Sequence, residues 1–529
     1  MTKYRGNPWA ILLVLSLGFF MTLLDLTIVN IAIPNMITKL NASLDDVLWV
    51  INAYALVLAV LLITAGRLGD LFGQRTMFIT GIVVFTLASA ACGLSPSVGW
   101  LIGFRAVQGL GAAILMPQTL ALLTMVFPAD RRGAAFGIWG AVAGVATIAG
   151  PTLGGLLVTA FDWRYIFFVN LPIGVVVLVL SGILIPDLRT GREHRLDVSG
   201  VLLATVALLA ICYGLVEGQR YDWGKITSLV SIPLVLGVGV AVLLIFLLVQ
   251  ARKQDREPLV PFSLFRDRNF SVMNFVSGTV AIGMLGIFLP FTIYLQSVLG
   301  FTALKAGLTM APASLISMFV APVAGRMSDR IGGKYILIAG LTLFGLGMGL
   351  IALIAQTDSA WYDFLAPQVA AGIGIGCTFA PMITIAMRNI DPMMAGAASG
   401  LFNTTRQVGT VIGTAGVGAL LQNRLVAGFT SQAALRTARL PAPARLKIIT
   451  EFRQAARSGV QVGSGRSTSG LGGQIFTHGF VQGMRPTMTV PILILLVGAA
   501  SCLAIRQRAR SPEQAAPAGI AETSGSATS

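Results

Sequence analysis

The sequence repeats one ten-residue stretch, GRLGDLFGQR at residues 66–75 and GRMSDRIGGK at residues 325–334. Both copies fit the pattern G-R-x-x-D-x-x-G-x-[R/K], and 259 residues separate them. A second repeat, GAAFG at 133–137 and GAASG at 396–400, has an offset of 263 residues. Two glycine pairs follow that same offset: Gly109 with Gly372, and Gly111 with Gly374. Ordered matches at nearly one offset indicate an internal duplication, so we expect two related halves.

The composition places these halves in a membrane. Of the 529 residues, 55% are apolar and only 11% are charged, whereas soluble proteins carry about 25% charged residues. A spanning helix needs about 20 apolar residues, and such runs are too long for barrel strands. We therefore predict an all-α integral membrane protein and exclude a soluble enzyme, a disordered chain and a disulfide scaffold. The fourteen predicted transmembrane helices cover residues 9–33, 47–66, 76–94, 99–127, 133–160, 165–186, 196–216, 226–249, 270–297, 306–325, 335–355, 361–387, 395–420 and 486–506.

The positions of the runs predict how the chain is organised. We expect an N-terminal six-helix half over 1–186, two inserted helices over 187–250, and a C-terminal six-helix half over 251–510. Most Lys and Arg residues then fall on the side of the termini, which the positive-inside rule makes cytoplasmic. Residues 421–485 should form a long external loop, in which apolar residues at helical spacing over 448–456 predict a short amphipathic hairpin. The tail, 511–529, should be disordered.

Charge and motif content argue against several functions. The net charge of +16 is spread between apolar runs, which does not fit nucleic-acid binding. The two histidines, His194 and His478, fall on opposite sides of the membrane without nearby acid pairs, so neither an enzyme nor a metal or cofactor site is expected. Residues 218–225 match a phosphate loop only loosely, with Ile226 where Ser or Thr is needed. The four cysteines each lie in a different apolar run and should be small buried residues.

Four further motifs complete the pattern. They are LDLTIVNIAIP at 24–34, RAVQGLG at 105–111, GPTLGG at 150–155 and WRYIF at 163–167. Together with the duplicated turn, they resemble the major facilitator superfamily, and specifically its fourteen-helix drug:proton antiporters of the QacA/EmrB type.

The resemblance implies the major facilitator fold with alternating access between the two halves. It also implies proton-coupled export of lipophilic drugs or antibiotics, monocationic or neutral, across the plasma membrane. The expected partners are the substrate, protons and the lipid bilayer, and we expect a monomer without cofactors. Export of a specific lipid or secreted metabolite on the same fold is the alternative.

Asp25 is the only carboxylate deep inside a predicted span, where it costs about 2.5–3.5 kcal/mol on insertion scales. At 1.5 Å per residue, Arg105 should lie at the same depth within roughly 5 Å. We therefore predict that Asp25 and Arg105 pair and couple transport to protons, a role that the resemblance also implies. A static ion pair that only orients the helices is the alternative.

Polar residues inside other spans predict a substrate cavity. Gln108 shares the helical face of Arg105, and Arg406 is a second embedded cation, with Asn403 and Gln407 beside it. Arg406 either extends its side chain to the cytoplasmic surface or pairs with substrate, and the sequence leaves both open. The predicted cavity residues are Asn30, Gln108, Asn403, Arg406 and Gln407. The last six spans contain no acid, so a dicationic substrate is disfavoured.

Small residues at alternating steps of three and four line the predicted span 133–160. They allow a neighbouring helix to approach closely, and the proline adds a kink. Close packing alone explains the stripe, but the repeat counterpart of Gly150-Pro151 is Gly413-Thr414, so the kink belongs to one half. We predict an antiport bend at Gly144, Gly150, Pro151 and Gly154, which resembles the family's antiporter motif.

The duplicated turn combines tight glycines with a carboxylate near a helix start. Such a carboxylate can cap its own helix or meet the N-terminus of another helix. Because Asp329 repeats Asp70, we favour a state-dependent latch between the halves over simple capping. The predicted latch residues are Gly66, Asp70, Gly73, Arg75, Gly325 and Asp329.

Overall fold

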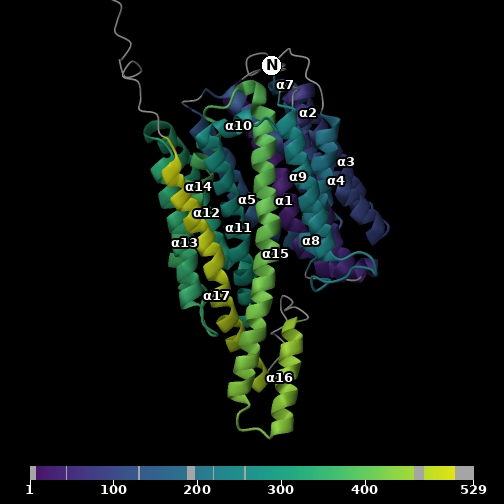
Figure 1. Ribbon diagram of the computed structural model, residues 1–529, viewed down its shortest axis with the longest axis vertical. Coiled ribbons are helices and arrows are strands. Elements are labelled where there is room, and N and C mark those ends of the chain that lie inside the picture. Colours follow the sequence, from purple (N-terminus) through teal and green to yellow (C-terminus); the bar gives the residue numbers. More distant parts are fainter. Residues whose placement is uncertain are drawn as a thin grey trace, which may run out of the picture.

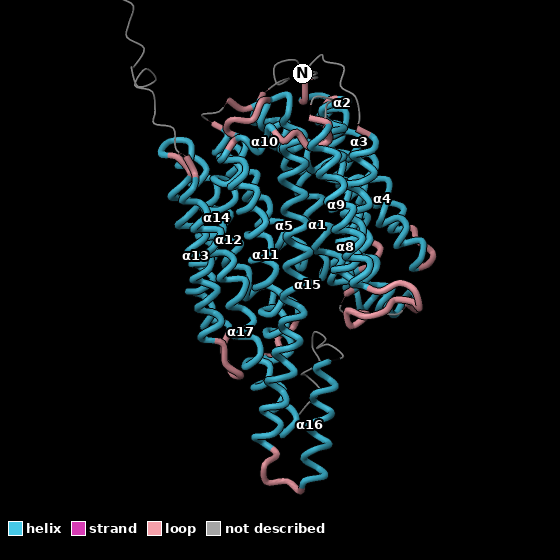
Figure 2. The backbone as a smooth tube through the Cα atoms, in the orientation of Figure 1, coloured by secondary structure: helices cyan, strands magenta, loops and turns pink. Residues whose placement is uncertain are grey.

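The computed structural model describes residues 7–42, 44–128, 131–186, 197–218, 220–254, 258–457 and 470–506. Within these ranges the protein is a bundle of long helices that run side by side along its longest axis (Figures 1 and 2). The same ranges contain no strand, only an isolated bridge between Lys225 and Ser231. The predicted all-α fold is confirmed.

The N-terminal part of the bundle is α1 (Pro8–Leu40), α2 (Leu44–Phe72), α3 (Gln74–Gly93), α4 (Val98–Val126), α5 (Arg132–Ala160), α6 (Tyr165–Phe168) and α7 (Asn170–Leu184). Two helices follow, α8 (Val198–Glu217) and α9 (Ile232–Arg252). The C-terminal part is α10 (Ser263–Arg266), α11 (Arg268–Ile293), α12 (Ala303–Ile331), α13 (Lys334–Ile354), α14 (Leu365–Met387), α15 (Ala395–Arg436), α16 (Ala442–Arg457) and α17 (Leu471–Ser501).

In the described residues, twelve helices are long and apolar enough to cross a membrane. The other two predicted spans, 133–160 and 395–420, coincide with α5 and α15, which are long helices but are not among the twelve. In α15 the polar run from Asn403 to Gln407 interrupts the apolar sequence. The count of fourteen and the side of the termini therefore stay predictions.

The duplicated turn explains where two helices end. Gly73 and Gly332, at equivalent positions of the two copies, have φ angles of 89° and 87°. Residues that carry a side chain rarely adopt such positive φ angles. Glycine therefore allows the chain to turn directly from α2 into α3 and from α12 towards α13.

The duplication is also visible in how the helices pack. A Cβ atom on Gly109 would meet the backbone of Tyr54 in α2, and one on Gly372 would meet the backbone of Ala313 in α12. The next pair behaves the same way: Gly111 lies against Phe85, and Gly374 lies against Phe344. Since Tyr54 and Ala313, like Phe85 and Phe344, are 259 residues apart, both halves use the same close helix contacts.

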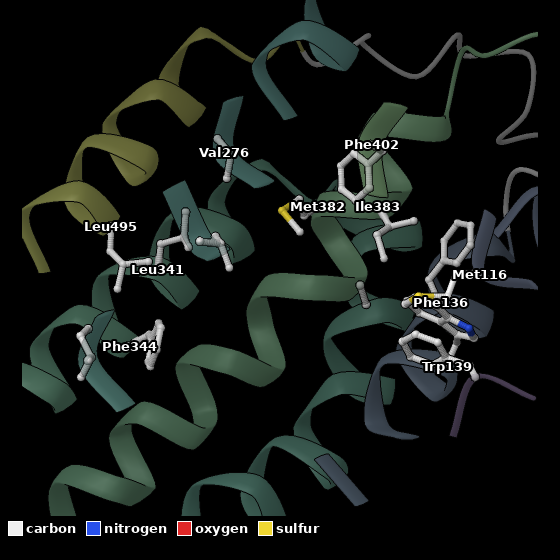
Figure 3. Close-up of a cluster of buried hydrophobic side chains, with 14 of the residues drawn as sticks. Met116, Phe136, Trp139, Val276, Leu341, Phe344, Met382, Ile383, Phe402 and Leu495 are labelled. Atoms are coloured by element: carbon white, nitrogen blue, oxygen red, sulfur yellow. The ribbon is translucent and has the colours of Figure 1, made fainter. Parts of the chain in front are cut away.

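A continuous apolar core joins the two halves. Figure 3 shows Met116, Phe136 and Trp139 from the N-terminal part near Ile383 and Phe402 from the C-terminal part, and all five belong to one buried cluster. The Trp139 ring stacks on Phe19 of α1 with a centroid distance of 3.9 Å. Helix α5 therefore lies at the centre of the molecule, in contact with α1, α12 and α14.

The segment predicted as a long loop, 421–485, is helical over most of its described length. Helix α15 continues to Arg436, α16 (Ala442–Arg457) includes the residues predicted as amphipathic, 448–456, and α17 already begins at Leu471. Buried apolar residues recur at helical spacing beyond the predicted end of the span at residue 420: Leu421, Leu425, Phe429 and Ala433. Phe429 packs on Phe452 and Phe476, with centroid distances of 6.0 and 5.3 Å. These extensions project beyond the bundle, at the end opposite the N-terminus (Figure 1).

One prediction falls outside the described residues, namely the disordered tail over 511–529.

Candidate functional site

The structure brings Asp25 and Arg105 together. Arg105 Nη1 donates to Asp25 Oδ2 in an ion pair, and both side chains are fully buried. Arg105 Nε donates to the backbone carbonyl of Val50 in α2 at 3.0 Å, which fixes the guanidinium plane. The pair therefore connects α1, α4 and α2 at one buried point.

Two amides complete the surroundings of the Asp25 carboxylate. Gln108 Nε2 donates to Asp25 Oδ1 at 2.9 Å, and Asn170 Nδ2 reaches the same oxygen at 3.3 Å. Gln108 Oε1 accepts from Arg105 Nη1 at 2.8 Å, so Gln108 bridges the two charges. Three side-chain donors from α4 and α7 therefore meet at the Asp25 carboxylate. Gln108, predicted to line the cavity, is instead fully buried in this ion-pair site.

An aromatic ring and a serine extend the site. The Arg105 guanidinium carbon lies 4.4 Å from the centroid of the Tyr54 ring, a cation–π contact. Asn170 Nδ2 also donates to Ser89 Oγ at 3.1 Å, and Ser89 Oγ donates to the carbonyl of Phe167 at 2.9 Å. Tyr54, Ser89 and Asn170 are not among the predicted site residues. For Asn170 a signal existed, because it is a polar residue that opens an apolar span just after the WRYIF motif.

Two predicted cavity residues of α15, Asn403 and Arg406, lie on one face of that helix. Ser399, Asn403, Arg406 and Thr410 follow at steps of four, three and four, and Ser399 Oγ donates to the carbonyl of Pro117 in α4 at 2.8 Å. This face therefore points towards the N-terminal half. Arg406 lies about 10 Å further along the helix than Ser399. It is half-buried, and no carboxylate of the described residues forms an ion pair with it.

We call these four residues of α15 (Ser399, Asn403, Arg406 and Thr410) the α15 stripe. Two other predicted cavity residues, Gln407 and Asn30, do not belong to it. Gln407 is half-buried next to Arg406, whereas Asn30 belongs to α1 but its side chain lies outside what the structure describes. The Asp25 site and the α15 stripe are thus separate groups of polar residues.

The duplicated aspartates each cap a helix of the opposite half. Asp70, near the end of α2, accepts hydrogen bonds from the backbone N–H groups of Gly396 and Ala397, both at 2.9 Å. Asp329, near the end of α12, accepts from Gly133 and Ala134 at 2.8 and 2.9 Å. Each carboxylate therefore binds the N-terminus of α15 or α5, where the helix dipole favours a negative charge. The two repeated motifs contact each other across the molecule.

The glycines of these motifs make the close approach possible. A Cβ on Gly66 would collide with the carbonyl oxygen of Gly396, and one on Gly325 would collide with that of Gly133.

The basic residue that ends each copy of the duplicated turn also has an equivalent role in both halves. Arg75 Nη2 donates to the carbonyl of Gly182 at 2.8 Å, and Lys334 Nζ donates to that of Leu503 at 2.7 Å.

The two contacts differ in how they are protected. Asp70 is buried and receives a third hydrogen bond from Gln74 Nε2 at 3.1 Å, with Arg67 Nη1 4.0 Å from its other oxygen. At the second contact, Gly333 occupies the position of Gln74, Asp329 is half-buried and Arg326 is exposed. The Asp70 contact is the more enclosed of the two.

The predicted antiport bend lies against α1. A Cβ on Gly150 would collide with the Thr27 hydroxyl, two residues from Asp25, and Thr27 Oγ1 reaches the carbonyl of Ala146 at 3.4 Å. Gly154 is buried, while the surroundings of Gly144 and Pro151 lie outside what the structure describes. The position of Gly150 thus places α5 directly beside the segment that carries the buried acid.

Comparison with known proteins agrees with this architecture. The model of the Major Facilitator Superfamily matches residues 15–414. The tetracenomycin C resistance and export protein of Streptomyces glaucescens is 34% identical over 528 residues, covering 97% of this chain and 94% of its own. The puromycin resistance protein pur8 of Streptomyces alboniger is 38% identical over 414 residues, covering 77% and 80%.

A multidrug resistance protein, Stp, of Mycobacterium tuberculosis (strain CDC 1551 / Oshkosh) is 36% identical over 411 residues, covering 78% of this chain and 75% of its own. Among solved structures, the human organic anion transporter MFSD10 (TETRAN) superimposes with a TM-score of 0.56 at 12% identity, over 92% of this chain and 99% of that one. This likeness shows the fold alone. The chain is a multi-pass protein of the plasma membrane and belongs to the major facilitator superfamily.

Proposed function

We propose that this protein is a proton-coupled efflux antiporter that exports lipophilic, monocationic or neutral drugs by alternating access. The observation that carries the proposal is the buried Asp25–Arg105 pair with its amide donors. Intramembrane acids of this kind mark ion pathways in transporters. Relatives named for antibiotic and multidrug resistance support drug export as the physiological task.

The coupling we propose starts from the charge balance at Asp25. In the ionised state the carboxylate holds Arg105, and this pair ties α4 to α1. A proton on Asp25 removes the negative charge and weakens its bond to Arg105, because the attraction between two opposite charges is lost and the guanidinium then faces a neutral carboxyl group. Since α5 packs on α1 at Gly150 and on α12 in the other half, a shift of α1 reaches the interface between the halves.

The two aspartate contacts would set which end of the transporter is closed. Asp70 and Asp329 hold the halves together at the end that carries the duplicated turns. Opening this end requires that both helix N-termini lose their carboxylate caps, at about 0.5–2 kcal/mol each. We therefore propose that these contacts form the latch of the alternating-access cycle.

The substrate would bind between the halves, in reach of the α15 stripe with Asn403 and Arg406. Drug-like ligands bind in largely apolar sites with a few polar groups that orient them, and the stripe offers such groups. Arg406 would contact polar or electron-rich parts of the substrate. We further propose that the halves meet as 1–186 and 251–510 in a monomer, with the helices of 187–250 inserted between them.

The test is transport by the purified protein in proteoliposomes with an imposed pH gradient and a fluorescent lipophilic dye. One proton crossing 100 mV supplies about 2.3 kcal/mol, which supports roughly a fortyfold gradient of an uncharged substrate. Asp25→Asn should insert normally and abolish gradient-driven transport, because an amide does not exchange a proton. Wild-type transport by this variant would contradict the proposal. A panel of cationic, neutral, anionic and lipid substrates distinguishes drug export from export of one lipid or metabolite.

A further inference from the structure

Asn170 occupies a special place in the chain. It is the first residue of α7, directly after Val169, the one residue between α7 and the short helix α6. The backbone of Val169 itself stays helical, with φ of −59° and ψ of −26°. The side-chain nitrogen of Asn170 contacts both Asp25 Oδ1 and Ser89 Oγ, and Ser89 in turn donates to the carbonyl of Phe167 in α6. A chain of hydrogen bonds therefore runs from the buried acid to the α6–α7 junction.

The side-chain oxygen of Asn170 has no partner. Asn170 is fully buried, and its Oδ1 makes no hydrogen bond with the described residues. A buried acceptor without a donor costs about 1–3 kcal/mol, so its presence calls for a reason. An ionised Asp25 has no proton to offer this oxygen, whereas a protonated Asp25 carries an O–H donor.

The other polar groups around Asp25 either lack a hydrogen-bond acceptor or already have a partner. Arg105 of α4 has donors only, and the oxygen of Gln108 accepts from Arg105. Tyr54 of α2 directs its hydroxyl to the carbonyl of Thr22 at 3.4 Å, and Cys92 of α3 lies against Gln108 Oε1 at 3.6 Å. Among the described neighbours of the carboxylate, Asn170 therefore provides the free acceptor.

We propose that Asn170 is a hydrogen-bond switch that reports the protonation state of Asp25 to the α6–α7 junction. This inference rests on the proposed proton coupling at Asp25. When Asp25 is ionised, the amide nitrogen of Asn170 donates to it, as the structure shows. When Asp25 binds a proton, the amide turns over about its terminal torsion, which has two nearly equivalent minima. Oδ1 then accepts the O–H of Asp25, and the proton stays on the carboxyl group.

The turn of the amide changes the partner of Ser89. In the ionised state Ser89 accepts from Asn170 and donates to Phe167. With Oδ1 in the former place of the nitrogen, the Ser89 hydroxyl rotates to donate to Oδ1 and releases the carbonyl of Phe167. The Phe167 carbonyl belongs to α6 and also contacts the backbone N–H of Val169, the residue between α6 and α7. The protonation of Asp25 thereby changes the hydrogen bonds at the α6–α7 junction, although no charged group moves there.

Infrared spectroscopy of the full-length protein in lipid nanodiscs tests the switch directly. The C=O band of protonated Asp25 is identified as the band that Asp25→Asn removes. In Asn170→Leu, which has similar size and no acceptor, we expect this band to shift to higher frequency and proton-driven transport to fall about tenfold or more. An unshifted band with a wild-type pH profile of transport would overturn the proposal.

Two further variants separate a switch from a structural role. Asn170→Thr keeps an acceptor, so the band should return towards its wild-type position and transport should partly recover. Ser89→Ala should leave the band unchanged but reduce transport, because the connection to Phe167 is lost. Should Asn170→Leu fail to fold, an unshifted band in a folded Asn170→Ala would equally refute the switch.

The same experiments separate this inference from the function it rests on. If Asp25→Asn transports like wild type, proton coupling at Asp25 fails regardless of Asn170. If Asp25→Asn abolishes gradient-driven transport while Asn170→Leu keeps the band and the pH profile, only the switch fails.

Discussion

Equivalent positions in the two halves share their packing but differ in their chemistry. Gly109 and Gly372 bring α4 onto α2 and α14 onto α12 in the same way. One turn before these glycines stand Arg105 in the first half and Gln368 in the second, 263 residues apart. Arg105 has an ion pair, whereas the fully buried amide of Gln368 has no partner for either of its polar atoms within the described residues.

This difference shows what the duplication preserved. Close helix packing and the aspartate contacts between the halves are common to both copies, so we propose that they form the framework that moves during transport. Within the described residues the buried charge pair occurs in one copy only. Our proposal therefore assigns the proton chemistry to the N-terminal half and the α15 stripe to the substrate.

The largest difference in transport should appear when the equivalent residues Arg105 and Gln368 are each replaced by alanine. Arg105→Ala leaves a buried carboxylate unpaired, and breaking such a pair costs about 3–5 kcal/mol. Transport should be severely reduced at every pH, because the buried carboxylate is left without its partner. The matched variant, Gln368→Ala, removes an unpaired amide and should transport nearly normally. Gradient-driven efflux is measured for both variants across pH. Equal losses of transport would contradict the assignment of the proton chemistry to the N-terminal half.

A double-mutant cycle sharpens the same comparison. Residues that act as one unit are not additive, so Asp25→Asn combined with Arg105→Ala should lose little more activity than either single variant. Gln368→Ala combined with Asp25→Asn should behave as Asp25→Asn alone. Additive losses for the first pair would show that Asp25 and Arg105 work independently.

The next effect concerns the packing of α5. Gly150→Val should reduce transport strongly, because its side chain collides with Thr27 beside the buried acid. Gly155→Val is the matched control in the same helix, since a Cβ there meets nothing within 4 Å. We expect overpacking of about 1–3 kcal/mol for the first variant and little change for the second. Thermal unfolding in detergent and efflux together measure both, and wild-type behaviour of Gly150→Val would remove the special role of this contact.

A smaller effect should distinguish the two latch contacts. Asp70→Ala removes the hydrogen bonds from Gly396, Ala397 and Gln74 in a buried setting, whereas Asp329→Ala removes those from Gly133 and Ala134 in a half-buried one. We expect both to lower transport, with the greater loss, about tenfold, for Asp70. Hydrogen exchange at the N-termini of α15 and α5 should rise in the respective variants. Equal exchange and equal transport in both would show that the contacts are interchangeable.

The smallest effect should come from a residue that belongs to neither half. Burial alone would raise the pKa of Asp197, but hydrogen bonds from Lys253, Gln250 and the N-terminus of α8 lower it to about 2. Because this value lies below the usual aspartate pKa of about 3.9, the carboxylate contributes stability above pH 4, which is lost as the pH falls towards 2.

Asp197→Asn should therefore lower the thermal stability slightly at pH 7 and leave transport unchanged. The difference in melting temperature from wild type should shrink as the pH falls towards 3. A difference that stays constant with pH would mean that the charge of Asp197 does not stabilise α8 against α9.

Sequence patterns predicted the features that depend on local periodicity. Apolar runs anticipated the helices, and the duplicated turn anticipated two related aspartates. The depth estimate for Asp25 and Arg105 succeeded because both lie in regular helices, where residue number converts directly into distance. Asn170 and Ser89 escaped because single small polar residues are common in spans, and only the tertiary fold brings three distant helices to one carboxylate.

Other features depended on long-range contacts. The partner of Asp70 lies 326 residues away at Gly396, and no local pattern predicts which helix end meets which carboxylate. The extension of α15 beyond residue 420 was missed because 421–485 was taken as an external loop. In the structure, this extension packs against α16 and α17.

Helix α15 has 42 residues, or about 63 Å at 1.5 Å per residue, roughly twice the thickness of the hydrocarbon core. It begins at the Asp70 contact, passes Arg406 and ends beside α16, outside the bundle. Because a continuous helix moves largely as one piece, a tilt at the Asp70 contact would displace the far end of α15 beside α16. With the predicted orientation this end lies outside the cell, so we expect that a nanobody bound to α15 and α16 there would slow transport without entering the membrane.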